Sequence, residues 1–213
     1  MENRSILREW FDRVDYQKTG NITATQLKSA FAVGNLHFSI SVLQQMLRMY
    51  DFDRNGTMSF EEFVELNKFL LKIQQAFSGL DRGRGFLVPD EAYEALVKIG
   101  FSLDSPAFYT ACESFDQSRS GKLRLDDFIS LCIFVQSARN LFNSFDTSKA
   151  GRVTLDFNQF IYCNEGPLLL PPVNTRHLLF FGLSSFKLQN MKDPSLLTRA
   201  YARLMRNGLC FDR

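Results

Sequence analysis

Residues 51–62 read Asp-Phe-Asp-Arg-Asn-Gly-Thr-Met-Ser-Phe-Glu-Glu, and this stretch decides the fold. Side chains that carry oxygen stand at loop positions 1, 3, 5, 7, 9 and 12, where the chain has Asp51, Asp53, Asn55, Thr57, Ser59 and Glu62. Gly56, at position 6, permits the sharp turn with which such a loop surrounds an ion. Calcium takes six to eight oxygen ligands, including both carboxylate oxygens at position 12. The stretch therefore predicts a Ca²⁺ site with these six residues as metal ligands and a sensor-range affinity of roughly 10⁻⁷ to 10⁻⁵ M.

The pattern around this loop occurs five times along the chain. The opening aspartates are Asp15, Asp51, Asp81, Asp116 and Asp146. Each follows apolar residues four and one positions back, which places both on one face of an entering helix. The corresponding loops are predicted at residues 15–26, 51–62, 81–91, 116–127 and 146–157. The third is one residue shorter, since its glycine arrives one position early. These copies predict an all-α fold of five tandem helix-loop-helix units, that is, EF-hands.

The distances between the copies predict that some helices are shared. Only 30 residues separate Asp51 from Asp81, and again Asp116 from Asp146. That interval leaves no room for a linker between two helices. We therefore predict two shared helices, over residues 61–80 and 126–145. The longer intervals contain helix breakers, and Ser39 and either Asp104 or Ser105 are predicted helix caps.

An odd number of units has a consequence for assembly. EF-hand loops pair side by side through a short ribbon at position 8, so the first can pair with the second and the third with the fourth. The fifth is left with an unpaired edge and an apolar face. We therefore predict a homodimer or heterodimer through the fifth EF-hand.

Several segments resemble those of the penta-EF-hand family. They are Phe-Asp-Arg-Val-Asp at 11–15, Gly-Lys-Leu at 121–123 and Asp-Asp-Phe-Ile at 126–129. The resemblance covers about residues 3–163, and we take residues 1–163 as one penta-EF-hand domain. It implies an all-α dimer that exposes apolar surface on binding calcium and captures short, often Pro-rich, partner segments. The chain departs from the family in having no Gly/Pro-rich N-terminal arm and in an atypical tail, residues 164–213.

Three of the other loops are predicted not to bind calcium. In the first, Gln26 replaces the bidentate acid, so one carboxylate is left and the loop stays empty at cytosolic calcium. In the third, Arg82 and Arg84 stand where oxygens are needed, and their charge repels a cation. In the fifth, Ala150 and Phe157 occupy ligand positions. The third and fifth loops are therefore predicted to be structural.

The fourth loop is an intermediate case. It offers Asp116, Ser118, Ser120 and Asp127, with Arg124 at position 9. An aspartate at position 12 is shorter than a glutamate and gives one oxygen, which suits the six-coordinate shell of Mg²⁺ better than that of Ca²⁺. We predict at most weak Mg²⁺ binding there.

Composition excludes several classes of protein. The formal net charge of +2 does not indicate a nucleic-acid partner, and no run of 18 or more apolar residues predicts a membrane span. His37 and His177 belong to no catalytic or zinc motif, so we predict that the chain is not an enzyme. The cysteines, Cys112, Cys132, Cys163 and Cys210, include no CxxC pair and predict reduced thiols. The expected location is the cytoplasm, with the nucleus and a peripheral membrane position left open.

The tail, residues 164–213, does not continue the repeat. Residues 195–207 have the pattern of a basic amphipathic helix. Three interpretations stay open: a membrane-surface anchor, an internal ligand of the partner groove, or an extension that is partly disordered.

Together these features predict a calcium sensor and adaptor. On calcium binding, Glu62 gives both oxygens, the adjoining helices change their angle and an apolar groove opens for a partner protein. The alternative is a constitutive dimeric scaffold or regulatory subunit with little calcium response.

Overall fold

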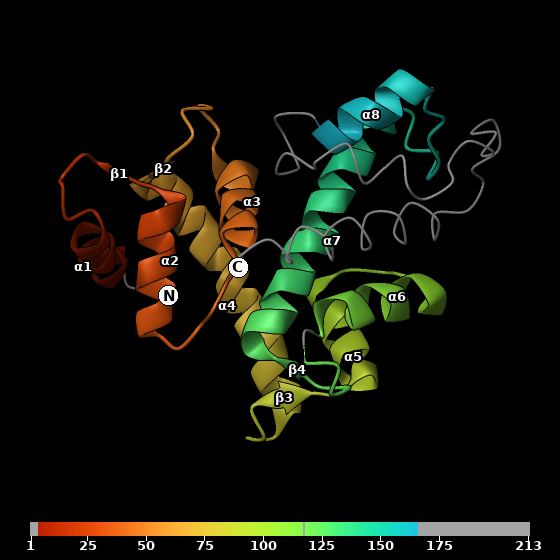
Figure 1. Cartoon of the computed structure of the whole chain (residues 1–213), viewed down its shortest axis with the longest axis horizontal. Coiled ribbons are helices and arrows are strands. Elements are labelled where there is room, and N and C mark those ends of the chain that lie inside the picture. The colour runs from red at the N-terminus through yellow and green to blue at the C-terminus, as the bar shows by residue number, and fades with distance from the viewer. Residues whose placement is uncertain (1–3, 117, 166–213) are drawn as a thin grey trace.

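The computed structural model describes residues 4–116 and 118–165 and is dominated by helices (Figure 1). The helices are Arg4–Val14 (α1), Ala24–Val33 (α2), Ile40–Tyr50 (α3), Phe60–Asp81 (α4), Pro89–Ile99 (α5), Ser105–Phe115 (α6), Leu125–Phe145 (α7) and Phe157–Glu165 (α8). The strands are Asn21–Ile22 (β1), Met58–Ser59 (β2), Phe86–Leu87 (β3) and Leu123–Arg124 (β4). This order confirms an all-α fold of tandem helix-loop-helix units.

The two long helices, α4 and α7, are the predicted shared helices. Each leaves one loop and enters the next, and each agrees with the predicted range to within a residue at both ends. Both cross the middle of the molecule in Figure 1, with α1 to α3 on one side and α5 and α6 on the other. Because α4 and α7 also contact each other, they join the two halves into one body.

The loops pair as the spacing predicts. β1 and β2 form an antiparallel ribbon in which Ile22 faces Met58, and β3 and β4 form another in which Leu87 faces Leu123. All four side chains are fully buried. The first unit is therefore coupled to the second, and the third to the fourth. Within the described residues the fifth loop contributes no strand.

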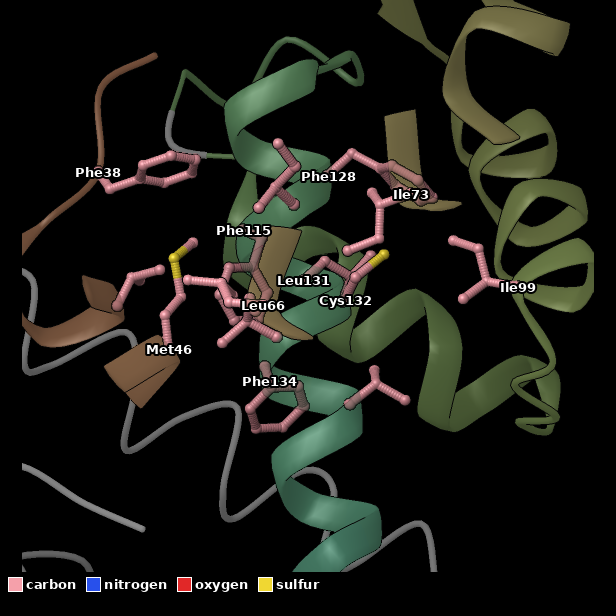
Figure 2. Packing of buried hydrophobic residues seen from close by; sticks show 14 of the residues in the cluster. Phe38, Met46, Leu66, Ile73, Ile99, Phe115, Phe128, Leu131, Cys132 and Phe134 are labelled. Atoms are coloured by element: carbon pink, nitrogen blue, oxygen red, sulfur yellow. The ribbon is translucent and has the colours of Figure 1, made fainter. Parts of the chain in front are cut away.

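One position of the repeat lies in the core in each of the first four units. The residue four places before the opening aspartate is buried in the first four units, where it is Phe11, Leu47, Phe77 and Cys112. These side chains belong to one continuous core cluster. Figure 2 shows the middle of it, where Met46 of α3, Leu66 of α4 and Leu131 of α7 lie together. A fully buried side chain of this size contributes roughly 1.5–3 kcal/mol through the hydrophobic effect.

Helix caps set where the units begin. The Ser39 hydroxyl accepts a hydrogen bond from the Val42 amide at 3.3 Å, and the Asp104 carboxylate accepts one from the Ala107 amide at 2.8 Å. Asp104 is thus the cap of α6, and Ser105 is its first helical residue.

None of the helices in the described residues is long and apolar enough to cross a membrane. α8 ends at Glu165, just past the domain boundary that we placed at residue 163, and that boundary stays a prediction. The three interpretations of the tail concern residues that lie outside the described part of the chain, apart from the last residues of α8.

Candidate metal centre

The second loop lies between α3 and α4 and is held by both helices. Asp51 caps the C-terminus of α3, where its amide donates to the Leu47 carbonyl at 2.9 Å. Ser59 caps the N-terminus of α4, and Glu62 lies in the first turn of that helix. Positions 1 and 12 of the loop are therefore fixed by regular structure, while positions 3 to 7 belong to the connecting segment.

Three carboxylates of this loop come together. Asp51, Asp53 and Glu62 each offer an oxygen, and these oxygens lie within 4.8 Å of one another. Asp53 is exposed, Asp51 is half-buried and Glu62 is only 4% exposed. Hard carboxylate oxygens are the ligands that Ca²⁺ prefers, and like charges gathered this closely favour a bound cation. The residues present therefore fit a calcium ion.

Asp51 also organises the backbone of the loop. Its Oδ1 atom accepts a hydrogen bond from the Asn55 amide and its Oδ2 atom accepts one from the Gly56 amide, both at 2.9 Å. Gly56 has φ of +76°, in the left-handed region that favours glycine. The loop thus has its turn already formed around the first carboxylate.

The neutral candidates lie in the same loop. The Asn55 Oδ1 atom accepts hydrogen bonds from the amide of Thr57, at 2.7 Å, and from its hydroxyl, while the Asn55 Nδ2 atom donates to Asp53 at 2.8 Å. Ser59 donates its hydroxyl to Glu62 at 2.9 Å. Asp51, Asp53, Asn55 and Thr57 therefore form one hydrogen-bonded network and Ser59 and Glu62 form another, and the assignment of all six as metal ligands stays a prediction.

Glu62 is held by three donors. Its Oε1 atom accepts from the Phe52 amide at 2.8 Å, and its Oε2 atom accepts from the amide and hydroxyl of Ser59 at 2.8 and 2.9 Å. A buried carboxylate needs such partners, because an unsatisfied charge in the interior is costly. To give both oxygens to a cation, Glu62 has to exchange some of these hydrogen bonds.

The opening aspartates of the weaker loops have a structural role. Asp15, Asp116 and Asp146 are 4%, 8% and 9% exposed. Each accepts a hydrogen bond from the amide of the loop glycine five residues later, at 2.6 to 2.7 Å. Burial disfavours the charge of Asp15 and Asp116, but hydrogen bonds to each carboxylate outweigh burial and lower the pKa. An aspartate at position 1 therefore has a structural role that requires no metal ion.

In the fourth loop the position 12 carboxyl is partly neutral near pH 6. Burial raises the pKa of Asp127 to about 6, although the Arg124 amide donates to it at 3.2 Å and opposes that shift. Protons thus compete with a cation for this group. Mg²⁺ binding here stays a prediction.

Sequence reasoning missed an ion pair in the third loop. There the guanidinium of Arg84 donates to both carboxylate oxygens of Glu91, at 2.6 Å each. Glu91 ends the predicted loop 81–91, as Glu62 ends the loop 51–62. The shortened loop was the available signal, because allowing for one missing residue brings Glu91 to position 12.

Comparisons with known proteins agree with this architecture. The family model described as an EF-hand domain pair matches residues 4–67, which include the first two loops. An EF-hand pair implies Ca²⁺ as the ligand. Sorcin from Schistosoma japonicum is 33% identical over 157 residues, covering 73% of this chain and 91% of sorcin.

Two further proteins share most of the chain. Penta-EF hand domain-containing protein 2 from Dictyostelium discoideum is 29% identical over 154 residues, covering 72% of this chain and 74% of that protein. A solved structure of a homolog of programmed cell death 6 protein from Leishmania major Friedlin has a TM-score of 0.55 and 34% identity, covering 74% of this chain and 91% of its own. With five tandem units, two shared helices and these relatives, the chain belongs to the penta-EF-hand family.

Proposed function

We propose that this protein is a calcium sensor and adaptor whose switch is the second EF-hand loop. As a penta-EF-hand protein it is not an enzyme. The residues that would hold Ca²⁺ are Asp51, Asp53, Asn55, Thr57, Ser59 and Glu62. The bound ion would supply positive charge that neutralises the gathered carboxylates. The observation that carries the proposal is the approach of three carboxylate oxygens to within 4.8 Å of one another.

The first turn of α4 can transmit a movement of the Glu62 side chain to α1. Phe63, the next residue, stacks on Trp10 of α1 with ring centroids 4.7 Å apart. Phe60 lies under the guanidinium of Arg8, 3.5 Å from the ring centroid. Because these contacts flank the Glu62 carboxylate on the same helical turn, a movement of Glu62 changes how α1 packs. We propose that this repacking opens an apolar groove for a partner segment.

Calorimetry with matched variants tests the site. Glu62→Gln keeps the size of the side chain and removes its charge, and we expect it to weaken calcium binding by about tenfold or more. Glu65→Gln is the control, since Glu65 lies one turn along the same helix, is exposed and contacts Lys68. Unchanged affinity in Glu62→Gln would overturn the assignment of the second loop.

A second candidate, a constitutive dimeric scaffold, is supported by the fifth unit. Asp146 accepts amide hydrogen bonds from Ala150 and Gly151, so the fifth loop keeps its turn. Yet no described side chain of α8, from Phe157 to Ile161, is buried, and Phe157 is 63% exposed. An apolar residue left uncovered there supports pairing with the fifth unit of a second chain.

The molecular mass in solution and the heat of calcium binding together distinguish the sensor from the scaffold. A scaffold is dimeric by light scattering with and without calcium and shows no heat of calcium binding below the millimolar range. A sensor binds at micromolar calcium and then captures dye or peptide on newly exposed apolar surface.

We also propose an intracellular location, with the cytoplasm first and the nucleus or a peripheral membrane position as alternatives. Support comes from Cys112 and Cys132, which are free, buried thiols. Burial raises the pKa of both, which makes them unreactive. Fractionation of cells at low and high calcium tests this location.

A further inference from the structure

The third loop contains a cation of its own, the guanidinium of Arg84. Its Nη2 atom donates to both carboxylate oxygens of Glu91 at 2.6 Å and to the carbonyl of Leu80 at 3.3 Å. Its Nε atom donates to the carbonyl of Asp81 at 2.9 Å. Leu80 and Asp81 end α4, and Glu91 lies in the first turn of α5. One positive group therefore joins the two helices of the unit.

Glu91 occupies the place in the third unit that Glu62 occupies in the second. Glu91 accepts a hydrogen bond from the Val88 amide at 3.1 Å, as Glu62 accepts one from the Ser59 amide at 2.8 Å, in each case three residues back. In a calcium loop this position gives both of its carboxylate oxygens to the ion. In the third unit both carboxylate oxygens of Glu91 already accept hydrogen bonds from Arg84.

The environment favours this ion pair over exposed ones. The side chains of Arg84 and Glu91 are 35% and 18% exposed, whereas those of Lys98 and Glu94, a pair on the surface of α5, are 48% and 56% exposed. Solvent therefore screens the Arg84–Glu91 pair less. The charge-assisted hydrogen bonds to both carboxylate oxygens add to the strength of the pair, as do the carbonyls at the C-terminus of α4 that also accept from Arg84.

Further positive charge discourages a metal ion nearby. The ring of Phe86 lies under Arg84, 5.1 Å from the centroid, and under Lys122 of the fourth loop, 4.6 Å from it. Arg82 also acts on Glu91 through its charge. A divalent cation entering the third loop would have to displace Arg84 and approach these groups.

We propose that Arg84 is a built-in replacement for the metal ion of the third EF-hand. It bridges the end of α4 and Glu91, and it holds the α4–α5 unit in one conformation at any calcium concentration. Calcium responses are thereby confined to the first pair of units. The proposal does not depend on calcium binding to the second loop.

Hydrogen exchange measured by mass spectrometry on the whole chain tests this. In Arg84→Gln, we expect amides of residues 80–92 to exchange about tenfold faster, because the bridge between the helices is lost. Arg82→Gln removes the same charge from the same loop and is expected to leave exchange there close to wild type. Glu91→Gln should match Arg84→Gln, and the double variant should be no worse than either.

Three results would overturn the proposal. The first is unchanged exchange of residues 80–92 in Arg84→Gln, and the second is that the effects of the two single variants simply add in the double variant. The third needs only the wild-type protein: protection of residues 80–92 that rises on adding calcium would mean that the ion enters the third loop. Exchange in peptides from residues 51–62 of the same samples reports separately on the second loop. Failure of the sensor proposal can therefore be distinguished from failure of the Arg84 proposal.

Discussion

The indole ring of Trp10 stacks on the phenyl ring of Phe63, with centroids 4.7 Å apart and planes inclined by 5°. Trp10 is the single tryptophan of the chain, and Phe63 follows the candidate ligand Glu62. The fluorescence of the protein therefore reports on the first turn of α4, at the edge of the candidate metal centre.

Tryptophan emission should change during a calcium titration. If Glu62 exchanges its hydrogen bonds with Phe52 and Ser59 for a cation, the first turn of α4 moves and the stacking on Trp10 changes. We expect a saturable shift at micromolar calcium in wild type and in Glu65→Gln, and none in Glu62→Gln. A flat titration in a wild-type protein that binds calcium by calorimetry would contradict this coupling.

Gly56→Ala should weaken both the fold and the calcium site. The φ of +76° at Gly56 disfavours any side chain, although no atom lies within 4 Å of the added methyl. The loss of stability should be roughly 1–2 kcal/mol, all of it from backbone strain. Gly79→Ala is the matched control, since Gly79 is an exposed residue of α4 with equal space around it. That change should stabilise the protein by about 0.5–1 kcal/mol in urea unfolding.

Phe128→Ala should be strongly destabilising. Phe128 of α7 is fully buried, and its ring lies 5.9 Å from that of Phe77 of α4, so it joins the two shared helices. Removing the ring should cost about 3–5 kcal/mol. Val33→Ala, at a position 91% exposed, should change stability by less than about 0.5 kcal/mol. Equal chemical-denaturation midpoints for the two variants would be inconsistent with this core.

Stability should fall as pH rises through the titration of Asp127. Its pKa is raised from 3.8 to about 6, so the folded protein holds a proton that the unfolded chain has lost. The stability that the protonated Asp127 carboxyl contributes is fully present below pH 3.8 and is lost as the pH rises past 6. Asp127→Asn should remove this dependence on pH and raise the free energy of unfolding at pH 7 by about 1 kcal/mol relative to wild type. The gain is kept this small because solvent screens a partly exposed carboxyl.

Thermal unfolding between pH 4 and 8 measures this dependence. Glu113→Gln is the control, since Glu113 is exposed on α6 and the change removes the same charge. If Asp127→Asn and Glu113→Gln showed the same dependence of thermal stability on pH, the pH dependence could not be assigned to Asp127.

The repeated part of the fold could be predicted from sequence because its signals are local. An aspartate, a glycine five residues later (four in the third unit) and apolar residues at helical spacing define each unit over a short stretch of sequence. The interval of 30 residues leaves no room for a linker, and α4 and α7 confirm the shared helices. The pairing of Ile22 with Met58 follows from the position 8 rule in the same way.

The roles of individual side chains within the loops were less predictable. The charge of Arg84 indicates repulsion of calcium, but its bidentate contact with Glu91 depends on where α4 and α5 place the two groups. Likewise, the aspartates Asp15 and Asp116 resemble metal ligands in sequence, while their hydrogen bonds to loop amides show a second use. Side-chain direction at a loop is set by contacts between elements rather than by spacing.

The sequence by itself determined the number of units, the shared helices and the position of the candidate calcium loop, because each depends on residues close together along the chain. The tertiary structure decided which helix faces meet: α1 on the first turn of α4 through Trp10 and Phe63, and the end of α4 on α5 through Arg84 and Glu91. Such contacts join positions that no short periodicity relates, and they exist only once the helices are packed.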